Sequence, residues 1–446
     1  MDSGSTVEMV NGRVWLTEAS YSGSRMKIAV GPDATLVVDG GQHELTGRVE
    51  GKLKVNGGTV RLANISGGAD IDVSAHARLV FDGGVAEAAV KSHGSITFAA
   101  PTHVFGQFSS NATVNVTRGS EVIFAGEETA VSRLVSAGTL RVAAGELRVN
   151  GSMHSSGLVD VTSAISFVSG GSVIGGDGLV LRSGATLHVA GAVTFEAPVQ
   201  SVGLVDVSHG TVQFAGTDRH NLGGEGLQVG SDAVVVVQQG ELSMTAPFDS
   251  SGFVFVANAT TLSLGSTSRF GGRGLESHGQ VALTAAGASH AAGQVLVAGH
   301  HGLRSYGHLV IPTRGSIVFN SSGASTIGGG GIDSNGNVTV MAGLVKVAAG
   351  GFRSNGSVGV LGGSLLVSSP QPSVMGGRGI RVWARGALNI SSGMVTFRSK
   401  LRLDGNLHVH PSASVVFESA SGHVCGGAIL NCSDWIPDCE DGYHLD

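Results

Sequence analysis

The chain has 446 residues, of which 72 are glycine and only nine are proline, and its formal net charge is −6. Abundant glycine with so little proline excludes a collagen period and proline-rich disorder, so the glycines must interrupt a folded chain. The sequence also lacks a basic stripe for nucleic acid and an apolar run near the roughly 18 residues of a membrane helix. We therefore expect no nucleic-acid partner, and membrane attachment only through segments outside this chain.

The start of the chain reads Met1-Asp2-Ser3-Gly4, without the basic and apolar stretches of a secretory signal peptide. We expect residues 1–30 to form an N-terminal cap or an irregular lead-in. Residues 31–420 carry a repeating pattern, and residues 421–446 contain all three cysteines. The sequence therefore predicts three regions, 1–30, 31–420 and 421–446.

Short runs of alternating apolar and polar residues recur throughout the second region. In one of them Val205 and Val207 are followed by Val212 and Phe214, with serine, histidine and glycine between the two pairs. A period of two in such short runs predicts β-strands, and no stretch has the period and the caps of a helix. We expect Val207 and Phe214 to point into the core and Asp206 to point outward.

A glycine phrase divides the central and C-terminal parts into longer repeats. Its first copy reads Ile174-Gly-Gly-Asp-Gly-Leu, and the first glycines of the five copies are Gly175, Gly223, Gly271, Gly328 and Gly376. These positions give a period of about 48 residues, with the third interval nine residues longer than the others. Each repeat divides again into two units of roughly 21–26 residues, with glycine at the corners and about three strands per unit. The sequence therefore predicts an all-β fold, a single-stranded parallel β-helix of about 18 coils.

Over about residues 30–420 this pattern resembles the right-handed β-helix of pectin-lyase-like proteins and of adhesin-like passenger domains. The resemblance implies a right-handed coil. A left-handed β-helix would show strict hexapeptides, which are absent from the sequence. A string of β-sandwiches is the other alternative, and the direct adjacency of the units without linkers argues against it.

Carbohydrate-active β-helices place acidic residues, often with a basic partner, on neighbouring coils of one face. Asp70 and Asp72 form the best local pair, because residues i and i+2 of a strand share a face at about 6–7 Å. No second acid recurs one coil away, so we interpret the pair as solvated outward carboxylates. Asp333 follows four glycines as in a calcium-binding nonapeptide, but no nine-residue tandem follows it. We therefore assign no catalytic residue, no cofactor and no calcium site.

Histidines gather in the one repeat that is nine residues longer than the others. An expanded coil is expected to carry a protruding loop, where clustered imidazoles could bind zinc or copper. No His-x-His or HExxH pattern supports such a site, and surface histidines at corners are the simpler interpretation. The weak metal-binding candidates are His290, His300, His301 and His308, with His278 nearby.

Ten of the 15 asparagines begin an Asn-x-Ser/Thr sequon, an excess that indicates a glycoprotein of the eukaryotic secretory pathway. Frequent asparagine and serine at solenoid turns is the alternative explanation. A glycan cannot enter a packed core, so Asn115 should point outward between inward Val114 and Val116. The predicted glycosylation sites are Asn64, Asn111, Asn115, Asn150, Asn258, Asn320, Asn337, Asn355, Asn389 and Asn431.

The cysteines are Cys425, Cys432 and Cys439, spaced C-x6-C-x6-C and followed by Gly442 and Tyr443. This spacing resembles the start of an EGF-like or receptor-type cysteine-rich module, which implies disulfides at Cys432 and Cys439 and a chain that is a fragment of a larger protein. Cys425 occupies the apolar position of a degenerate sixth glycine phrase, so it is instead a candidate core residue.

Together these features predict a non-catalytic, structural or adhesive β-solenoid from an extracellular or cell-surface glycoprotein. Its expected partners are glycans or proteins of the cell surface or matrix. The alternative is a carbohydrate-binding or carbohydrate-cleaving β-helix, such as a polysaccharide lyase or hydrolase. Two carboxylates and a basic side chain that converge in a groove along one face would favour the enzyme, and their dispersal would exclude it.

Overall fold

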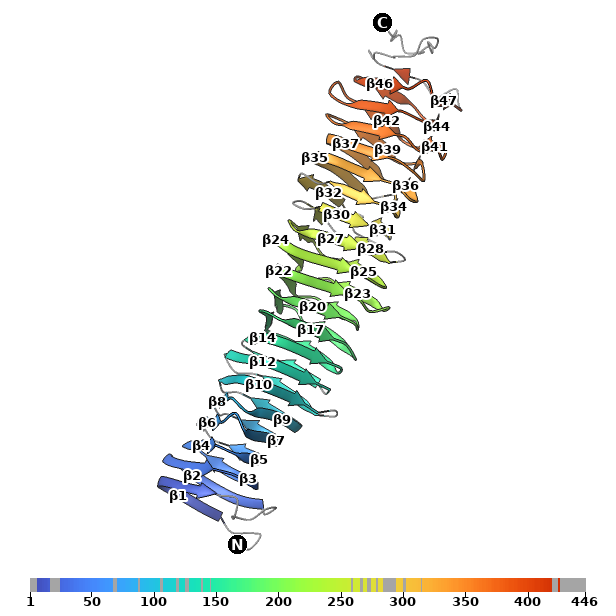
Figure 1. Ribbon diagram of the computed structural model, residues 1–446. Coiled ribbons are helices and arrows are strands. Elements are labelled where there is room, and N and C mark those ends of the chain that lie inside the picture. The colour runs from blue at the N-terminus through green and yellow to red at the C-terminus, as the bar shows by residue number, and fades with distance from the viewer. Residues whose placement is uncertain are drawn as a thin grey trace. The chain divides into compact units, whose positions relative to one another are not determined.

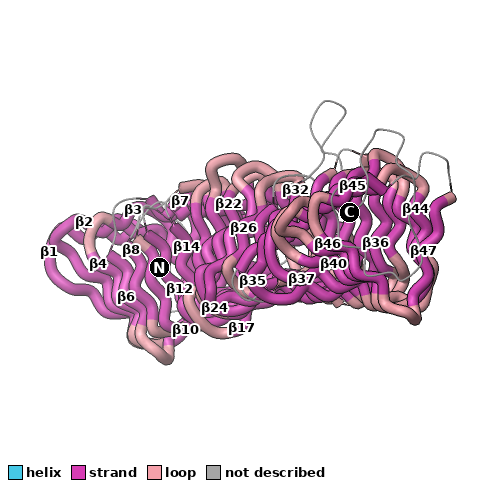
Figure 2. Tube along the Cα trace, turned by 90° about the horizontal axis from the view of Figure 1, so that it is seen from above, coloured by secondary structure: helices cyan, strands magenta, loops and turns pink. Residues whose placement is uncertain are grey.

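The structure is a computed structural model of the chain (Figure 1). It describes residues 6–16, 25–66, 70–86, 89–104, 107–117, 120–124, 128–137, 139–144, 146–257, 260–264, 268–270, 274–277, 280–283, 294–299, 302–313, 315–418 and 424–425. Within these ranges all regular structure is strand, and Figure 2 shows strands joined by short loops. The predicted all-β class is therefore confirmed.

The chain divides into two compact units. Unit 1 contains residues 1–206 and 210–212, and unit 2 contains residues 207–209 and 213–446. Each unit is a stack of parallel strands, and the two together hold about 18 turns of β-solenoid. The predicted parallel β-helix is confirmed, whereas its handedness stays a prediction.

The strands that lie in unit 1 are β1 (Thr6–Leu16), β2 (Arg25–Val38), β3 (Gln42–Val49), β4 (Lys52–Val55), β5 (Gly58–Ser66), β6 (Asp70–Val73), β7 (Ala77–Ala86), β8 (Ala89–Ser92), β9 (Ser95–Val104), β10 (Phe108–Val116), β11 (Glu121–Phe124), β12 (Glu128–Ser136), β13 (Thr139–Val142), β14 (Glu146–Ser155), β15 (Leu158–Val161), β16 (Ala164–Phe167), β17 (Gly171–Ile174), β18 (Gly178–Leu181), β19 (Thr186–Val189), β20 (Ala192–Phe195) and β21 (Val199–Ser201). β22 (Leu204–Phe214) contains residues of both units.

The strands that lie in unit 2 are β23 (Arg219–Leu222), β24 (Gly226–Val237), β25 (Glu241–Met244), β26 (Phe248–Ser250), β27 (Phe253–Val256), β28 (Thr261–Leu264), β29 (Ser268–Phe270), β30 (Gly274–Ser277), β31 (Gln280–Leu283), β32 (Gln294–Gly299), β33 (Leu303–Ser305), β34 (His308–Ile311), β35 (Ser316–Ile327), β36 (Gly331–Ser334), β37 (Asn337–Val347), β38 (Phe352–Ser354), β39 (Ser357–Val360), β40 (Ser364–Val367), β41 (Ser373–Met375), β42 (Gly379–Val382), β43 (Ala387–Ile390), β44 (Gly393–Phe397), β45 (Leu401–Leu403), β46 (Asn406–Val409), β47 (Ala413–Phe417) and β48 (Val424–Cys425).

From β15 to β20 a strand pairs with the strand three places further along the chain, as β15 does with β18, β16 with β19 and β17 with β20. Elsewhere one long strand takes the place of two, as β37 does by pairing with both β39 and β40. Three strands therefore complete one coil, and the paired strands form three columns. Val159 pairs with Leu179, so that coil has 20 residues. Leu53, near the start of unit 1, pairs with Ile71, so that coil has 18 residues. Other coils have the predicted length of roughly 21–26 residues, as where Arg219 pairs with Glu241 and Ser357 with Gly379. The pairing of β1 with β2 extends the parallel stack into residues 1–30.

The core is a ladder of apolar side chains from alternate strand positions, because successive strand residues point to opposite faces. Val207 is 0% exposed and Phe214 is 1% exposed, so both predicted inward positions are confirmed. Asp206, next to Val207, is only half-buried. Val114 and Val116 are likewise buried, and Asn115 points outward as predicted. Stacking of equivalent residues continues the ladder, with the Phe81 and Phe98 ring centroids 5.0 Å apart.

The long repeat marked by the glycine phrase holds seven strands rather than six. Three repeats show this directly: β15 to β21, β27 to β33, and β39 to β45. Since three strands make a coil, seven make two and one third coils, and the predicted division into two units per repeat is wrong. Each new repeat therefore starts one column further round. In unit 2 the first strands of three successive repeats, β27, β34 and β39, pair in three different columns.

This arrangement brings two sequence phrases together in space. A Ser-x-Gly phrase follows the seventh strand of a repeat, and the glycine phrase follows the third strand of the next repeat, three strands on. The amide of Gly175 donates to the carbonyl of Ser155 at 2.8 Å, and the amide of Gly328 donates to that of Ser305 at 2.6 Å. The same contact joins Gly376 to Ser354 at 2.6 Å. The glycine phrase of one repeat thus stacks on the Ser-x-Gly phrase at the end of the preceding repeat.

The close approach at this corner explains why the phrase is glycine. Gly377 has a φ of 69°, and a Cβ there would lie 1.7 Å from the carbonyl oxygen of Asn355. Gly176 has a φ of 65°, and a Cβ there would lie 1.9 Å from the carbonyl oxygen of Ser156. Only glycine accepts both the left-handed backbone and this contact. The period of the glycine phrase is therefore fixed by corner packing between repeats.

Candidate functional site

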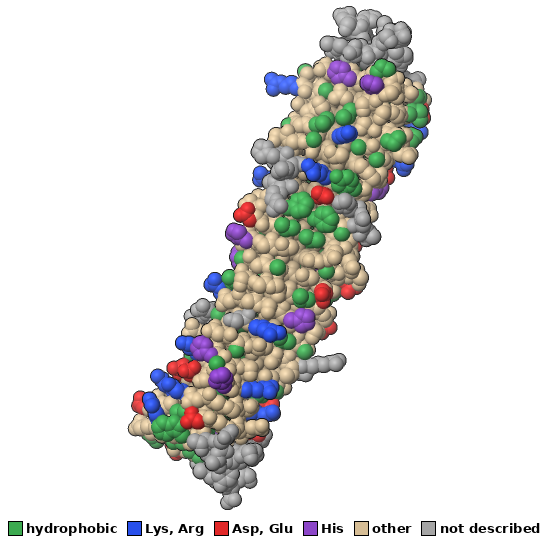
Figure 3. Space-filling model, viewed as in Figure 1, with side chains coloured by type: hydrophobic (Ala, Val, Ile, Leu, Met, Phe, Trp, Pro, Cys, Tyr) green, Lys and Arg blue, Asp and Glu red, His purple; other side chains and the backbone are tan. Residues whose placement is uncertain are grey.

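The outward strand positions form columns of their own, because parallel pairing places equivalent residues of successive coils side by side. Figure 3 shows charged side chains of both signs distributed over one face, with little hydrophobic surface over most of it. These outward columns are where the solenoid can meet a ligand, since the inward positions are filled by the apolar ladder.

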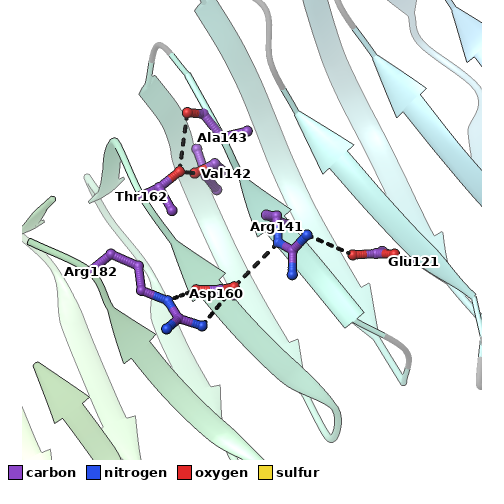
Figure 4. Close-up of polar contacts among 7 residues, drawn as sticks. All are labelled: Glu121, Arg141, Val142, Ala143, Asp160, Thr162 and Arg182. Carbon is purple, nitrogen blue, oxygen red and sulfur yellow. Dashed lines mark hydrogen bonds and ion pairs between the residues drawn. The ribbon is translucent and has the colours of Figure 1, made fainter.

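The most ordered outward column lies in unit 1 and joins four charged residues from successive coils (Figure 4). Glu121 on β11 accepts from Arg141 on β13, with Oε1 3.3 Å from Nη1. Arg141 Nε then lies 3.2 Å from Asp160 Oδ2 on β15, and Arg182 Nε, just after β18, lies 2.9 Å from Asp160 Oδ1. The column thus alternates in sign from coil to coil.

Asp160 is the buried member of this column, since its side chain is only 4% exposed. Burial alone would raise the pKa of the Asp160 carboxyl, but the hydrogen bonds and positive charges of Arg182 and Arg141 outweigh it and lower that pKa below its usual value. The hydrogen bond to Asp160 in turn raises the pKa of the Arg182 guanidinium. Because both carboxylate oxygens are engaged by arginines, Asp160 stabilises the fold and is a poor general acid or base.

Two histidines form pairs with aspartates on neighbouring coils. His188 Nδ1 lies 2.9 Å from Asp206 Oδ2, and His308 Nε2 lies 3.0 Å from Asp333 Oδ2. His308 is the one metal-binding candidate that can be placed, since His278, His290, His300 and His301 lie outside the described residues. Within the described ranges no group of three or more metal-ligating side chains occurs. The predicted metal candidates therefore stay a prediction.

Asp70 and Asp72 lie on the exposed face of β6, and Ile71 and Val73, which alternate with them, are buried. In the preceding coil the register places Lys54 beside Asp72, and in the following coil it places Lys91 there. The neighbours of this pair along its column are therefore not acidic, and the outward interpretation of the two carboxylates is confirmed.

The sequons occupy several kinds of position. Asn64 lies in β5, and Asn258 and Asn431 lie outside the described residues. Asn115 and Asn389 are half-buried on outward strand positions. The exposed sequon asparagines are Asn111, Asn150, Asn320, Asn337 and Asn355. Five sites can therefore be reached without disturbing the core, and their occupancy stays a prediction.

Only one of the three C-terminal cysteines lies among the described residues. Cys425 lies in β48, the last described strand, whereas Cys432 and Cys439 lie outside the described residues. The disulfide and the cysteine-rich module therefore stay predictions. No helix among the described residues is long and apolar enough to cross a membrane.

The first strand of each repeat shows how the two faces differ. Its inward pair is apolar in all six repeats, from Val159 and Val161 to Leu407 and Val409, and it is buried in the first five. Its outward pair changes each time, in chain order Leu158 and Asp160, Leu204 and Asp206, Phe253 and Phe255, His308 and Val310, Ser357 and Gly359, Asn406 and His408. The fold therefore constrains one face of this strand and leaves the other free to vary.

Comparison with protein families identifies this repeat. The model of the haemagglutinin repeat matches residues 33–100, 135–197, 201–305 and 312–392, together more than half of the chain. The chain belongs to the haemagglutinin repeat family. Proteins with haemagglutinin repeats are typically surface or secreted adhesins, so family membership supports an adhesin-like structural role. No curated protein and no solved structure matches the chain.

The sequence analysis missed the charged column of this haemagglutinin repeat chain. Asp160 occurs in the phrase Leu-Val-Asp-Val, which the sequence repeats at Asp206, and nothing local indicates that the first copy is buried. The available signal was its spacing from two arginines, 19 residues after Arg141 and 22 residues before Arg182. Each spacing is close to the length of one coil, so it predicts stacked charges once that length is known.

Proposed function

We propose that the chain is a non-catalytic adhesive module, a solenoid scaffold that presents varied outward side chains to glycans or proteins of a cell surface or matrix. The observation that carries the proposal is the contrast within the first strand of each repeat, where the inward pair stays apolar and the outward pair changes. An enzyme would instead require acids and a basic partner gathered at one place. Glu121, Arg141 and Asp160 do bring two carboxylates and a basic side chain onto one face. Both oxygens of Asp160 are bound by arginines, however, so this carboxylate is not available as a general acid or base.

Adhesion can be tested with beads that carry the complete chain. We expect such beads to capture or agglutinate erythrocytes, because many copies on one bead raise a weak single-site affinity by avidity. Beads with heat-unfolded chain or with serum albumin are the controls. Binding no greater than that of the controls would contradict an adhesive role on these cells.

We also propose that the chain is extracellular or exposed at the cell surface and that it carries N-glycans. Five sequon asparagines on exposed positions support this proposal, since a glycan needs an outward side chain. After expression in a secreting eukaryotic cell, glycosidase treatment should lower the intact mass by several glycans. Asn337→Gln should remove one glycan, whereas Asn335→Gln should remove none, because Asn335 does not begin a sequon. Secretion without any mass loss would contradict the glycan proposal.

A further inference from the structure

An apolar patch covers the outward face of unit 2 where β24 and β27 pair. Val234 lies opposite Phe253 and Val236 lies opposite Phe255, and all four side chains are half-buried. We call these four residues the Phe253 patch. Figure 3 shows hydrophobic side chains gathered over this part of the surface. The core does not need them, because Val254 and Val256 of the same strand point inward and are 0% exposed.

The equivalent outward pairs of the other repeats show that this patch is not required by the fold. The positions of Phe253 and Phe255 are taken by Ser357 and Gly359 in one repeat and by Asn406 and His408 in another. Removing apolar groups from water lowers the free energy. A contiguous apolar surface patch with a polar rim therefore commonly marks a binding site. Phe253 and Phe255 place two aromatic side chains on one strand face, about 6–7 Å apart along the chain.

Polar groups border the patch on both sides. Glu276 lies opposite Phe255 in the next coil, and Arg304 lies opposite Glu276 in the coil after that. On the other side Gln238 follows Val237 and is exposed, and its side-chain carbonyl accepts a hydrogen bond from Gln213. Exposed Asp232 lies on the same face of β24, two residues before Val234. The described rim therefore combines two carboxylates, one guanidinium and two amides.

We propose that the Phe253 patch binds the apolar ring face of an uncharged sugar chain, whose hydroxyl groups would meet the polar residues around the patch. A platform of aromatic rings with a few polar groups at its border is the usual chemistry of a site for a small, amphipathic ligand. A stable protein partner would need roughly 800 Å² on this chain, and four half-buried side chains offer only a small part of that area. With more carboxylates than guanidinium groups among its described residues, this rim also disfavours a sulfated, strongly anionic chain. This inference rests on the proposed adhesive function and names its ligand.

The test measures binding of two uncharged hexasaccharides, chitohexaose and cellohexaose, to the complete chain by saturation-transfer NMR and titration calorimetry. We expect at least one of them to bind. Phe253→Ser with Phe255→Thr should weaken that binding about tenfold, since one aromatic contact contributes on the order of 1 kcal/mol. Val310→Thr is the matched control, because Val310 holds the same outward position in the next repeat, and it should leave the affinity unchanged.

Three results would overturn the proposal: neither hexasaccharide binds, the double variant binds as tightly as the unaltered chain, or a heparin hexasaccharide binds in place of both. Circular dichroism checks that the double variant is folded. If it is not, Phe255→Leu keeps the apolar surface but removes an aromatic ring, and unchanged binding by that variant overturns the proposal equally. Bead adhesion separates the two hypotheses. Beads with the double variant that still capture erythrocytes would leave adhesion intact and reject the patch as the adhesive site. Hexasaccharide binding without bead capture would support the patch as a sugar site and contradict the adhesive function.

Discussion

β15 of unit 1 and β27 of unit 2 are the same strand of two repeats, yet they present opposite surfaces. Both have a buried valine pair, Val159 and Val161 in one and Val254 and Val256 in the other, all 0% exposed. On their outward faces β15 carries Asp160, which is held between two arginines, and β27 carries Phe255, which extends an apolar patch. The comparison teaches that stability and surface chemistry are carried by alternate residues of one strand.

The largest expected change in the free energy of unfolding comes from a polar substitution on the inward face of β27. Val254→Asp should place an unpaired carboxylate in the apolar ladder and lower the free energy of unfolding by about 4 kcal/mol or more. Phe255→Ser, one residue away on the outward face, should change it by less than about 1 kcal/mol. Urea unfolding followed by circular dichroism measures both. Equal sensitivity at the two positions would contradict the strand register.

The next effect concerns the corner where repeats stack. Gly377→Ala should cost roughly 3 kcal/mol, because it combines a left-handed backbone with a Cβ that lies 1.7 Å from a carbonyl oxygen. Thermal unfolding measures the loss.

Two other glycines separate the causes. Gly184 has a φ of 76° with no atom within 4 Å of a Cβ, so Gly184→Ala should cost only the backbone strain of roughly 1–2 kcal/mol. A Cβ at Gly171 also meets nothing within 4 Å, and Gly171→Ala, where φ is not left-handed, should cost less than about 0.5 kcal/mol. Similar losses at all three glycines would show that corner packing is not what fixes the repeat.

A smaller effect distinguishes the two copies of Leu-Val-Asp-Val. Asp160→Asn should cost roughly 2 kcal/mol, since it removes charged hydrogen bonds to two arginines from a nearly buried carboxylate. Asp206→Asn, at the equivalent and more exposed position, should cost less than about 1 kcal/mol.

The pH dependence of the Asp160 contribution follows from its lowered pKa. Its stabilising effect should be fully present above the unfolded value, about 3.9, and should be lost as pH falls through the lower folded value. Asp160→Asn should remove this acid sensitivity from the urea midpoints. An unchanged acid profile would mean that the arginines do not hold the carboxylate.

The smallest expected change in stability comes from protonation of one buried histidine in the core of unit 2. His220 is 0% exposed beside Phe214, with ring centroids 5.0 Å apart, and burial lowers the pKa of its imidazole despite the opposing effects of the Gly216 carbonyl and Asp218. The neutral form is therefore favoured in the folded state. Stability should be complete above the unfolded pKa of about 6.5 and should fall as pH drops toward the lower folded value.

His220→Leu tests this titration, because it places in the ladder the same residue type as its paired neighbour Leu242. The variant should flatten the unfolding midpoint between pH 7 and pH 5. A wild-type midpoint that does not change over that interval would show that the imidazole titrates in the folded chain as it does in the unfolded chain.

Most of the fold could be predicted from the sequence, because a period of two in short runs has one structural solution when the units follow each other directly. Val207 and Phe214 were placed inward by parity alone, and Asn115 was placed outward in the same way. The period of the glycine phrase was also visible, but not its meaning. A sequence period does not state how many strands complete a coil. The count of seven strands per repeat emerges only from the pairing, in which β15, β16 and β17 each pair with the third strand after them.

What the sequence determined by itself is which residues face the core, since that depends only on local alternation and on the preference of apolar groups to leave water. What only the tertiary structure decided is which outward residues become neighbours, because that depends on the exact length of every coil between them. Asp160 meets arginines 19 and 22 residues away, and Phe255 meets Val236 on the preceding coil. A one-residue change in one coil would give each of them a different partner, and so a different chemistry.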